Sequence, residues 1–91
     1  MEKLTPDEQI MYIFAFRYSL QRKSCALSLV SRLIVERVAE FEDWQLRDMI
    51  GEVEEYWATN KDILVVDRDL QRLFRDRLQD ALSGRSAEAA R

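Results

Sequence analysis

The sequence predicts an all-α protein, a compact bundle of about four helices. A chain of 91 residues has the length of one small domain. It contains only two glycines and one proline, which is poor material for a β-rich fold with many turns. Its apolar residues recur mainly at spacings of three and four, the period of amphipathic helices. We therefore expect one helical domain over residues 1–84, followed by a flexible tail over 85–91.

The first helix is predicted from about Pro6 to Gln21. Thr5 can accept a hydrogen bond from the free N–H groups at the helix start, Pro6 fits the first helical position, and Glu8 completes a capping box. The helix is apolar almost all the way round. Its predicted apolar face consists of Ile10, Ile13, Phe14, Arg17 and Gln21, flanked by Leu20, Phe16, Tyr18 and Met11. Ala15, Ser19 and Arg22 mark its polar side. We expect the aromatic residues to lie mainly in the core.

A second helix is predicted over about 24–41, with Ser24 as its N-cap. Its apolar stripe consists of Leu27, Val30, Ile34, Val38 and Phe41. Only two or three residues separate this helix from the first one. We therefore expect the two helices to form an antiparallel hairpin.

A third helix is predicted over about 43–57, with Asp43 as its N-cap. Its apolar stripe consists of Leu46, Met49, Ile50, Val53, Tyr56 and Trp57. The opposite face carries acidic residues, with an aromatic residue at one end and a glycine in the middle. It consists of Trp44, Asp48, Gly51, Glu52 and Glu55.

The fourth helix is predicted from the apolar stripe formed by Leu70, Leu73, Phe74, Leu78 and Ala81. Its start is open between Asp67 and an earlier position, with Asn60 or Asp62 as the cap. Gly84 is predicted to end it, because glycine commonly follows the last turn of a helix. Arg77 lies within the predicted apolar stripe, as Arg17 does on the first helix.

Charge is distributed unevenly along the chain, although the formal net charge is only −3. Residues 9–35 include four basic residues and no acid, whereas residues 36–62 include nine acids against three basic residues. The single cysteine, Cys25, cannot form an internal disulfide, which fits a reducing compartment. The acidic start of the chain is unlike a signal peptide, and no apolar run approaches the ~18 residues of a membrane span. We expect a cytoplasmic protein.

The basic residues of the first half form one candidate binding region, made of Arg17, Arg22, Lys23 and Arg32. Neighbouring aromatic residues can stack on nucleic-acid bases while guanidinium groups pair with phosphates, so nucleic-acid binding is the alternative function. The acidic balance of the chain disfavours it. For Arg17 the competing interpretation is structural. A guanidinium in an apolar stripe needs carboxylate partners, and the acid-rich third helix offers them.

The acidic face of the third helix is the second candidate region, made of Trp44, Asp48, Glu52 and Glu55. Such a face can bind a basic protein surface, and tryptophan often anchors protein interfaces. The competing interpretation is an ordinary solvated face. Because homodimerisation through surplus apolar surface of the first or fourth helix is also compatible with the pattern, we keep it as a companion hypothesis.

Catalysis and cofactor binding lack any supporting motif. The chain contains no histidine to act as a base for Cys25, no glycine-rich phosphate loop, and no carboxylate spacing typical of a calcium loop. We therefore expect a non-enzymatic protein-binding module with neither a cofactor nor a metal.

The segment FAFRYSLQRKSCALSLVSRLIVERV, residues 14–38, resembles small uncharacterised proteins encoded by phages and mobile elements. In those proteins an F-x-F-R-Y-x-L-x-R stretch precedes an amphipathic helix. The chain also resembles anti-CRISPR inhibitors, a group of small enzyme-free phage proteins, in size, acidity and helicity. This resemblance implies an accessory protein that acts in the host cytoplasm. It further implies that the chain inhibits a host protein complex of the CRISPR type by covering one of its surfaces.

Overall fold

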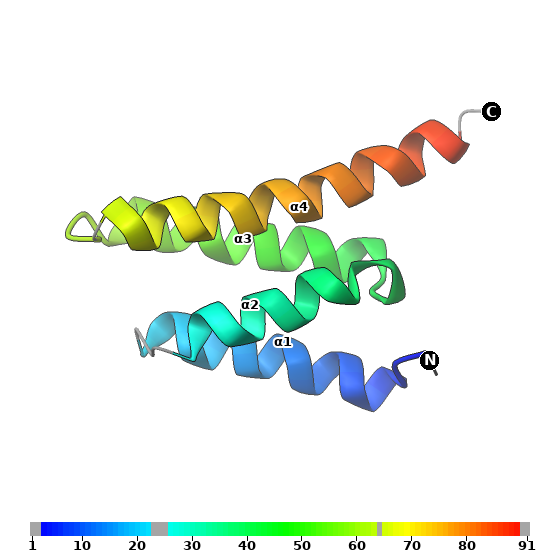
Figure 1. The fold of residues 1–91 in the computed structure, drawn as a ribbon, viewed down its shortest axis with the longest axis horizontal. Helices are drawn as coiled ribbons and strands as arrows, with labels where there is room; N and C mark the ends of the chain where they lie inside the picture. Colours follow the sequence, from blue (N-terminus) through cyan, green and yellow to red (C-terminus); the bar gives the residue numbers. More distant parts are fainter. Residues whose placement is uncertain (1–2, 23–25, 64, 90–91) are drawn as a thin grey trace.

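The fold is a helical bundle, as predicted (Figure 1). The computed structural model describes residues 3–22, 26–63 and 65–89. Within these residues there are four α-helices, one short 3₁₀ helix and no strand. The α-helices are α1 (Pro6–Gln21), α2 (Leu27–Glu36), α3 (Asp43–Thr59) and α4 (Val65–Ala89), and the 3₁₀ helix is η1 (Val38–Glu40).

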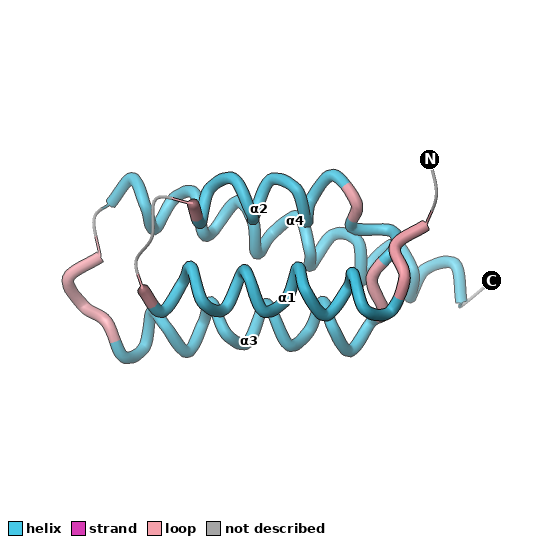
Figure 2. Tube along the Cα trace, turned by 90° about the horizontal axis from the view of Figure 1, so that it is seen from below, coloured by secondary structure: helices cyan, strands magenta, loops and turns pink. Residues whose placement is uncertain are grey.

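Helices α1 and α2 form the predicted antiparallel hairpin (Figure 1). The chain then crosses the bundle through η1, so that α3 packs beside α1 and α4 packs beside α2 (Figure 2). In consequence α1 and α3 run in the same direction, as do α2 and α4 (Figure 1). The bundle therefore has two broad sides, one built from α1 and α3 and the other from α2 and α4.

The core runs along the middle of the bundle. Phe16 and Phe74 stack at its centre, with ring centroids 4.8 Å apart. All residues of the apolar stripes predicted for the second and third helices are buried or partly buried, although Val38 and Phe41 lie beyond the end of α2. The buried apolar residues are Leu4, Ile13, Phe16, Leu20, Ile34, Phe41, Leu46, Met49, Ile50, Val53, Phe74, Leu78 and Leu82.

The orientation predicted for α1 is wrong. Its core face is formed by Ile13, Phe16 and Leu20, and Ser19, which was assigned to the polar side, is buried. Of the aromatic residues on this helix, Phe14 and Tyr18 are exposed and only Phe16 is buried in the core. The reason is that α1 is apolar nearly all round, so the pattern alone does not choose a direction. The packing of α1 against α2 and α3 determines which side of the helix is buried.

The second helix is shorter than predicted, because it ends at Glu36 and the chain turns through η1. Polar contacts hold this corner. The Glu40 carboxylate accepts hydrogen bonds from Arg37 Nε at 2.8 Å and from the Leu4 N–H at 2.6 Å. Gln9 Nε2 donates to the Glu40 carbonyl oxygen at 2.6 Å. The α2 helix is preceded by Ala26, and the predicted cap Ser24 lies outside the described residues.

The third helix begins one residue earlier than its predicted cap implied. Glu42 is the N-cap, and its N–H donates to Gln45 Oε1 at 2.8 Å. Asp43 is the first helical residue, and its carboxylate accepts a hydrogen bond from Arg85 Nη1 at 2.6 Å. Asp43 therefore links the start of α3 to α4 instead of capping its own helix.

The fourth helix starts at Val65, between the two predicted starts, and Asn60 is instead the C-cap of α3. The prediction that Gly84 ends α4 is wrong, because the helix continues to Ala89. Arg85 stabilises this extension through its contact with Asp43 and a hydrogen bond to the Val38 carbonyl oxygen at 3.1 Å. The flexibility expected of residues 85–91 stays a prediction.

Candidate protein-binding surfaces

Arg17 forms an ion-pair cluster between α1 and α3. Its Nη2 lies 2.5 Å from Asp48 Oδ2 and 3.2 Å from Glu52 Oε1. The Arg17 and Asp48 side chains are 37% and 38% exposed, so the cluster lies at the edge of the core. The predicted ion pair between Arg17 and the third helix is confirmed. The positive charge of Arg17 thus partly neutralises Asp48 and Glu52, two members of the predicted acidic surface.

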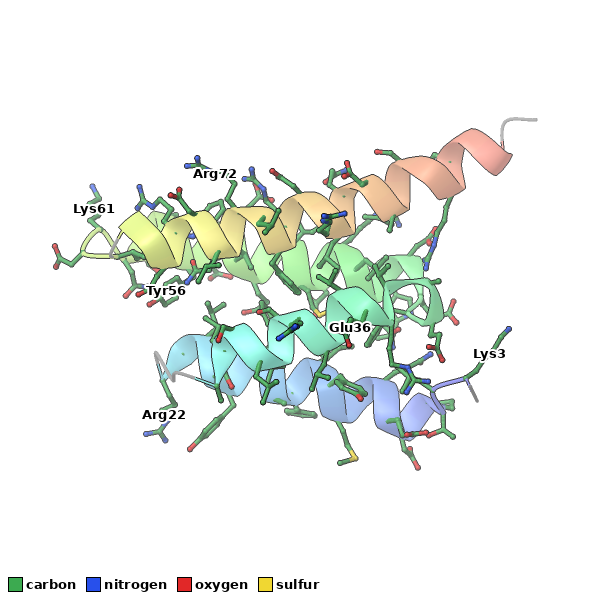
Figure 3. The ribbon with its side chains drawn as sticks, in the orientation of Figure 1. Lys3, Arg22, Glu36, Tyr56, Lys61 and Arg72 are labelled. Carbon is green, nitrogen blue, oxygen red and sulfur yellow. The ribbon has the colours of Figure 1, made fainter. Side chains whose placement is uncertain are left out.

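The predicted basic region does not form one surface among its described members. Arg17 is engaged between α1 and α3, whereas the exposed Arg32 lies on α2, 3.7 Å from Glu36. Arg22, at the end of α1, extends from the bundle with its guanidinium 5.3 Å from the centre of the Tyr18 ring (Figure 3). Lys23 lies outside the described residues. The basic region predicted from the sequence is therefore spread over different sides of the bundle.

A row of exposed apolar side chains runs along α1, formed by Ile10, Met11, Phe14 and Tyr18. Between 47% and 69% of each residue is exposed. Phe14 follows Ile10 and Met11 by four and three residues and precedes Tyr18 by four, so it is a neighbour of all three on the helix surface. Sequence reasoning assigned these residues to the core or its edges. The signal that identifies them is the excess of apolar residues on α1, which is more than one buried stripe needs.

The apolar row on α1 meets the predicted acidic surface at the Arg17 cluster. Phe14 lies one turn before Arg17 and Trp44 lies one turn before Asp48, so both aromatic residues lie at the same end of the ion pair, because α1 and α3 run in the same direction. Trp44 is 63% exposed. We call this surface the α1–α3 face. It consists of Ile10, Met11, Phe14, Tyr18 and Trp44, together with Arg17, Asp48, Glu52 and the exposed Glu55.

The opposite side of the bundle carries a groove of about 790 Å³ between α2 and α4. Leu27 and Val35 line it from α2, and Leu70, Leu73 and Phe74 line it from α4. The sequence placed Leu70 and Leu73 in the core, but both are half-exposed because the space between α2 and α4 is open on this side. The groove is also lined by four charged residues, which are Arg32, Glu36, Asp67 and Arg77.

Among the described residues, no group of three or more histidine, cysteine, aspartate or glutamate side chains is placed to hold a metal ion. Cys25 lies outside the described residues. No helix in the described part of the chain has the length and apolar character needed to cross a membrane.

Comparisons of this chain with protein-family models, with curated proteins and with solved structures found no match.

Proposed function

We propose that the protein is a non-enzymatic protein-binding module and that the α1–α3 face is its binding surface. The observation that carries this proposal is the row of exposed apolar residues on α1. Single exposed apolar residues are ordinary, but neighbouring ones on successive turns are typical of interaction sites. Three aromatic residues, Phe14, Tyr18 and Trp44, supply large contact areas with few rotatable bonds, which favours binding energy.

The charges on the α1–α3 face define the chemistry of the partner. Asp48 and Glu52 each retain oxygen lone pairs that Arg17 does not occupy, and Glu55 is exposed on the same helix. A complementary partner surface therefore combines an apolar depression with basic residues at its rim. In such a complex the aromatic residues supply affinity, while the carboxylates fix the orientation and increase the association rate.

The mode of action that we propose is occlusion. A helical face of this kind changes the activity of a partner by covering a surface that the partner needs. The resemblance to small phage-encoded proteins supports the version in which the covered surface belongs to a host protein complex of the CRISPR type and the result is inhibition. Nucleic-acid binding is less favoured, because Arg17 is engaged by two carboxylates and Arg32 lies on a different side of the bundle from it.

The proposal is tested by capture on the immobilised full chain from nuclease-treated host lysate, with mass spectrometry of the retained proteins. The test variant is Phe14→Ala combined with Tyr18→Ala, and the matched control is Leu29→Ala. Leu29 is also an exposed apolar residue, but it lies on α2. We expect the wild type and the control to retain the same protein, and we expect the test variant to lose it.

Two results would count against the proposal. One is retention of the same protein by the test variant, and the other is loss of all bound material after nuclease treatment. The charge component is tested separately with Glu55→Lys, since Glu55 takes no part in the Arg17 cluster. We expect this variant to weaken binding most at low salt, because exposed charges act over a longer range there.

A further inference from the structure

We propose that the groove between α2 and α4 is the interface of a symmetric dimer, in which α4 of each copy lies in the groove of the other. This surface is separate from the α1–α3 face, so the dimer and the proposed function are independent. The argument rests on the shape of the groove, on the exposed apolar edge of α4, and on the order of charges along α4.

The shape of the groove suits the binding of a helix. Its lining runs from Leu27 to Glu36 on α2 and from Asp67 to Arg77 on α4. The groove therefore follows these two helices, which lie side by side and run in the same direction (Figures 1 and 2). Phe74 and Leu20 are buried and Leu27 is partly buried along it. A volume of about 790 Å³ has room for several side chains of an inserted helix. An occupant with apolar residues on successive turns would cover this apolar lining.

Helix α4 also carries exposed apolar residues of the kind that an occupant of the groove needs. Leu70 and Leu73 are half-exposed and adjacent on the helix surface, and they form the outer wall of the groove. In a two-fold dimer the same surface is used by both copies. Each α4 then acts as a wall of its own groove and as the occupant of the other one. Leu70 and Leu73 of both copies become buried by this single arrangement.

The charges on α4 are self-complementary in that arrangement. Asp67 and Arg77 both line the groove, and neither takes part in an ion pair within the described residues. They are ten residues apart on one helix, a separation of about 15 Å at the helical rise, and so they cannot pair within a copy. When two α4 helices lie antiparallel, Asp67 of each copy can face Arg77 of the other. Two identical ion pairs result.

The position of the symmetry axis is also favourable. If Asp67 of each copy faces Arg77 of the other, the two-fold axis passes α4 at the level of Arg72, which is halfway between these two residues in the sequence. Two arginines meeting at a two-fold axis would repel each other, but Arg72 extends from the side of α4 that faces away from α2 (Figure 3). The Asp67 carboxylate of the second copy also comes near Arg32, which lines the groove from α2. Glu36, 3.7 Å from Arg32, offsets part of the arginine charge. The second copy therefore fits this groove in both shape and charge.

The dimer is tested by sedimentation equilibrium of the full chain with two single charge reversals, Asp67→Arg and Arg77→Asp. We expect the wild type to dimerise. Each single variant places like charges together twice, so its dissociation constant should rise at least about tenfold. A mixture of the two variants pairs unlike charges at both contacts, so the mixture should form a heterodimer. The double variant Asp67→Arg with Arg77→Asp should dimerise again.

The matched control is Asp69→Arg, which makes the same charge change on the same helix outside the groove lining. This control should dimerise like the wild type, and circular dichroism should show equal helix content in all variants. A wild type that stays monomeric up to high concentration would overturn the proposal. So would single variants that dimerise like the wild type, or a mixture that stays monomeric. In each of those cases the groove belongs to another occupant or to none.

Discussion

Arg17 on α1 donates a hydrogen bond from Nη2 to Asp48 Oδ2 on α3, at a distance of 2.5 Å. This contact joins two helices that run in the same direction and are separated in the chain by α2 and η1. Phe14 lies one turn before Arg17 on α1, and Trp44 lies one turn before Asp48 on α3. The ion pair therefore has two consequences: it stabilises the packing of α1 on α3, and it fixes the spacing of the two aromatic residues on the α1–α3 face.

We predict that the Arg17–Asp48 pair contributes a coupling free energy of about 0.5–1 kcal/mol, because both side chains are more than one third exposed and water screens them. The measurement is a double-mutant cycle with Arg17→Met and Asp48→Asn, using urea unfolding. The control cycle uses Arg32 and Glu36, which are 3.7 Å apart and largely exposed. Its coupling should be smaller, at about 0.3–0.5 kcal/mol. A larger coupling in the control cycle would contradict the assignment of Arg17 to the edge of the core.

We predict opposite outcomes for two phenylalanines that lie two residues apart on α1. Phe16→Ala should reduce the free energy of unfolding by about 3–5 kcal/mol, because Phe16 is 1% exposed and stacks on Phe74. Phe14→Ala should change it by no more than about 0.5 kcal/mol, because Phe14 is 66% exposed. Urea unfolding of both variants provides the measurement. Similar losses for the two variants would mean that α1 is rotated relative to the structure described above.

How far the sequence predicts this fold depends on how clearly each helix separates its apolar and polar residues. In α3, acidic residues occupy the side opposite Leu46 and Val53, so only one direction of burial is possible and the prediction is correct. In α1, apolar residues occur all round, and the buried side follows from where α2 and α3 pack. The Leu70 and Leu73 positions were predicted incorrectly for a related reason. Helical spacing identifies an apolar stripe but does not reveal whether a neighbouring helix covers it.

The same distinction applies to the candidate sites. The Arg17 contact with the third helix was predictable, because a guanidinium in an apolar stripe requires a carboxylate and the nearby acids lie on that helix. The corner around Glu40 was not predictable. Its contact with Leu4 joins residues 36 positions apart, and no local pattern encodes such a pairing. The α1–α3 face likewise became recognisable only when the crossing of η1 placed α3 beside α1.

We predict that Glu40 makes stability depend on pH in the acidic range. The hydrogen bonds from the Arg37 guanidinium, aided by the Leu4 N–H, hold the pKa of the Glu40 carboxyl below its ordinary value of 4.5. Since the pKa is lower in the folded state, the unfolded state binds the proton more tightly. The stabilisation is thus present in full above the unfolded-state pKa, and it is lost as the pH falls through the folded-state pKa.

The measurement that tests this prediction compares the wild type with Glu40→Gln by urea unfolding at a series of pH values. We expect the wild type to be the more stable protein at neutral pH, and we expect the difference to shrink as the pH falls below the ordinary carboxyl value of 4.5. Glu55→Gln is the matched control, because it makes the same substitution at an exposed carboxylate on α3. A difference between wild type and Glu40→Gln that stays constant down to low pH would show that the Glu40 carboxylate is not held by Arg37 and Leu4 in solution.

We predict that Gly51→Ala and Gly84→Ala each raise the free energy of unfolding by about 0.5–1 kcal/mol, because alanine restricts the unfolded chain and favours helix. A Cβ atom at either position meets no other atom within 4 Å, so the substitutions introduce no clash. Both glycines lie inside helices, Gly51 in α3 and Gly84 in α4. Thermal or urea unfolding measures the effect, and Ala58→Gly on α3 should show the reverse change.

The two glycine substitutions together also discriminate between two descriptions of the last turns of α4. If Gly51→Ala stabilises the protein while Gly84→Ala does not, then residue 84 is not helical in solution and Gly84 ends the helix, as the sequence alone predicts. If both stabilise it to a similar degree, α4 continues past Gly84, and Arg85 is held where it can pair with Asp43.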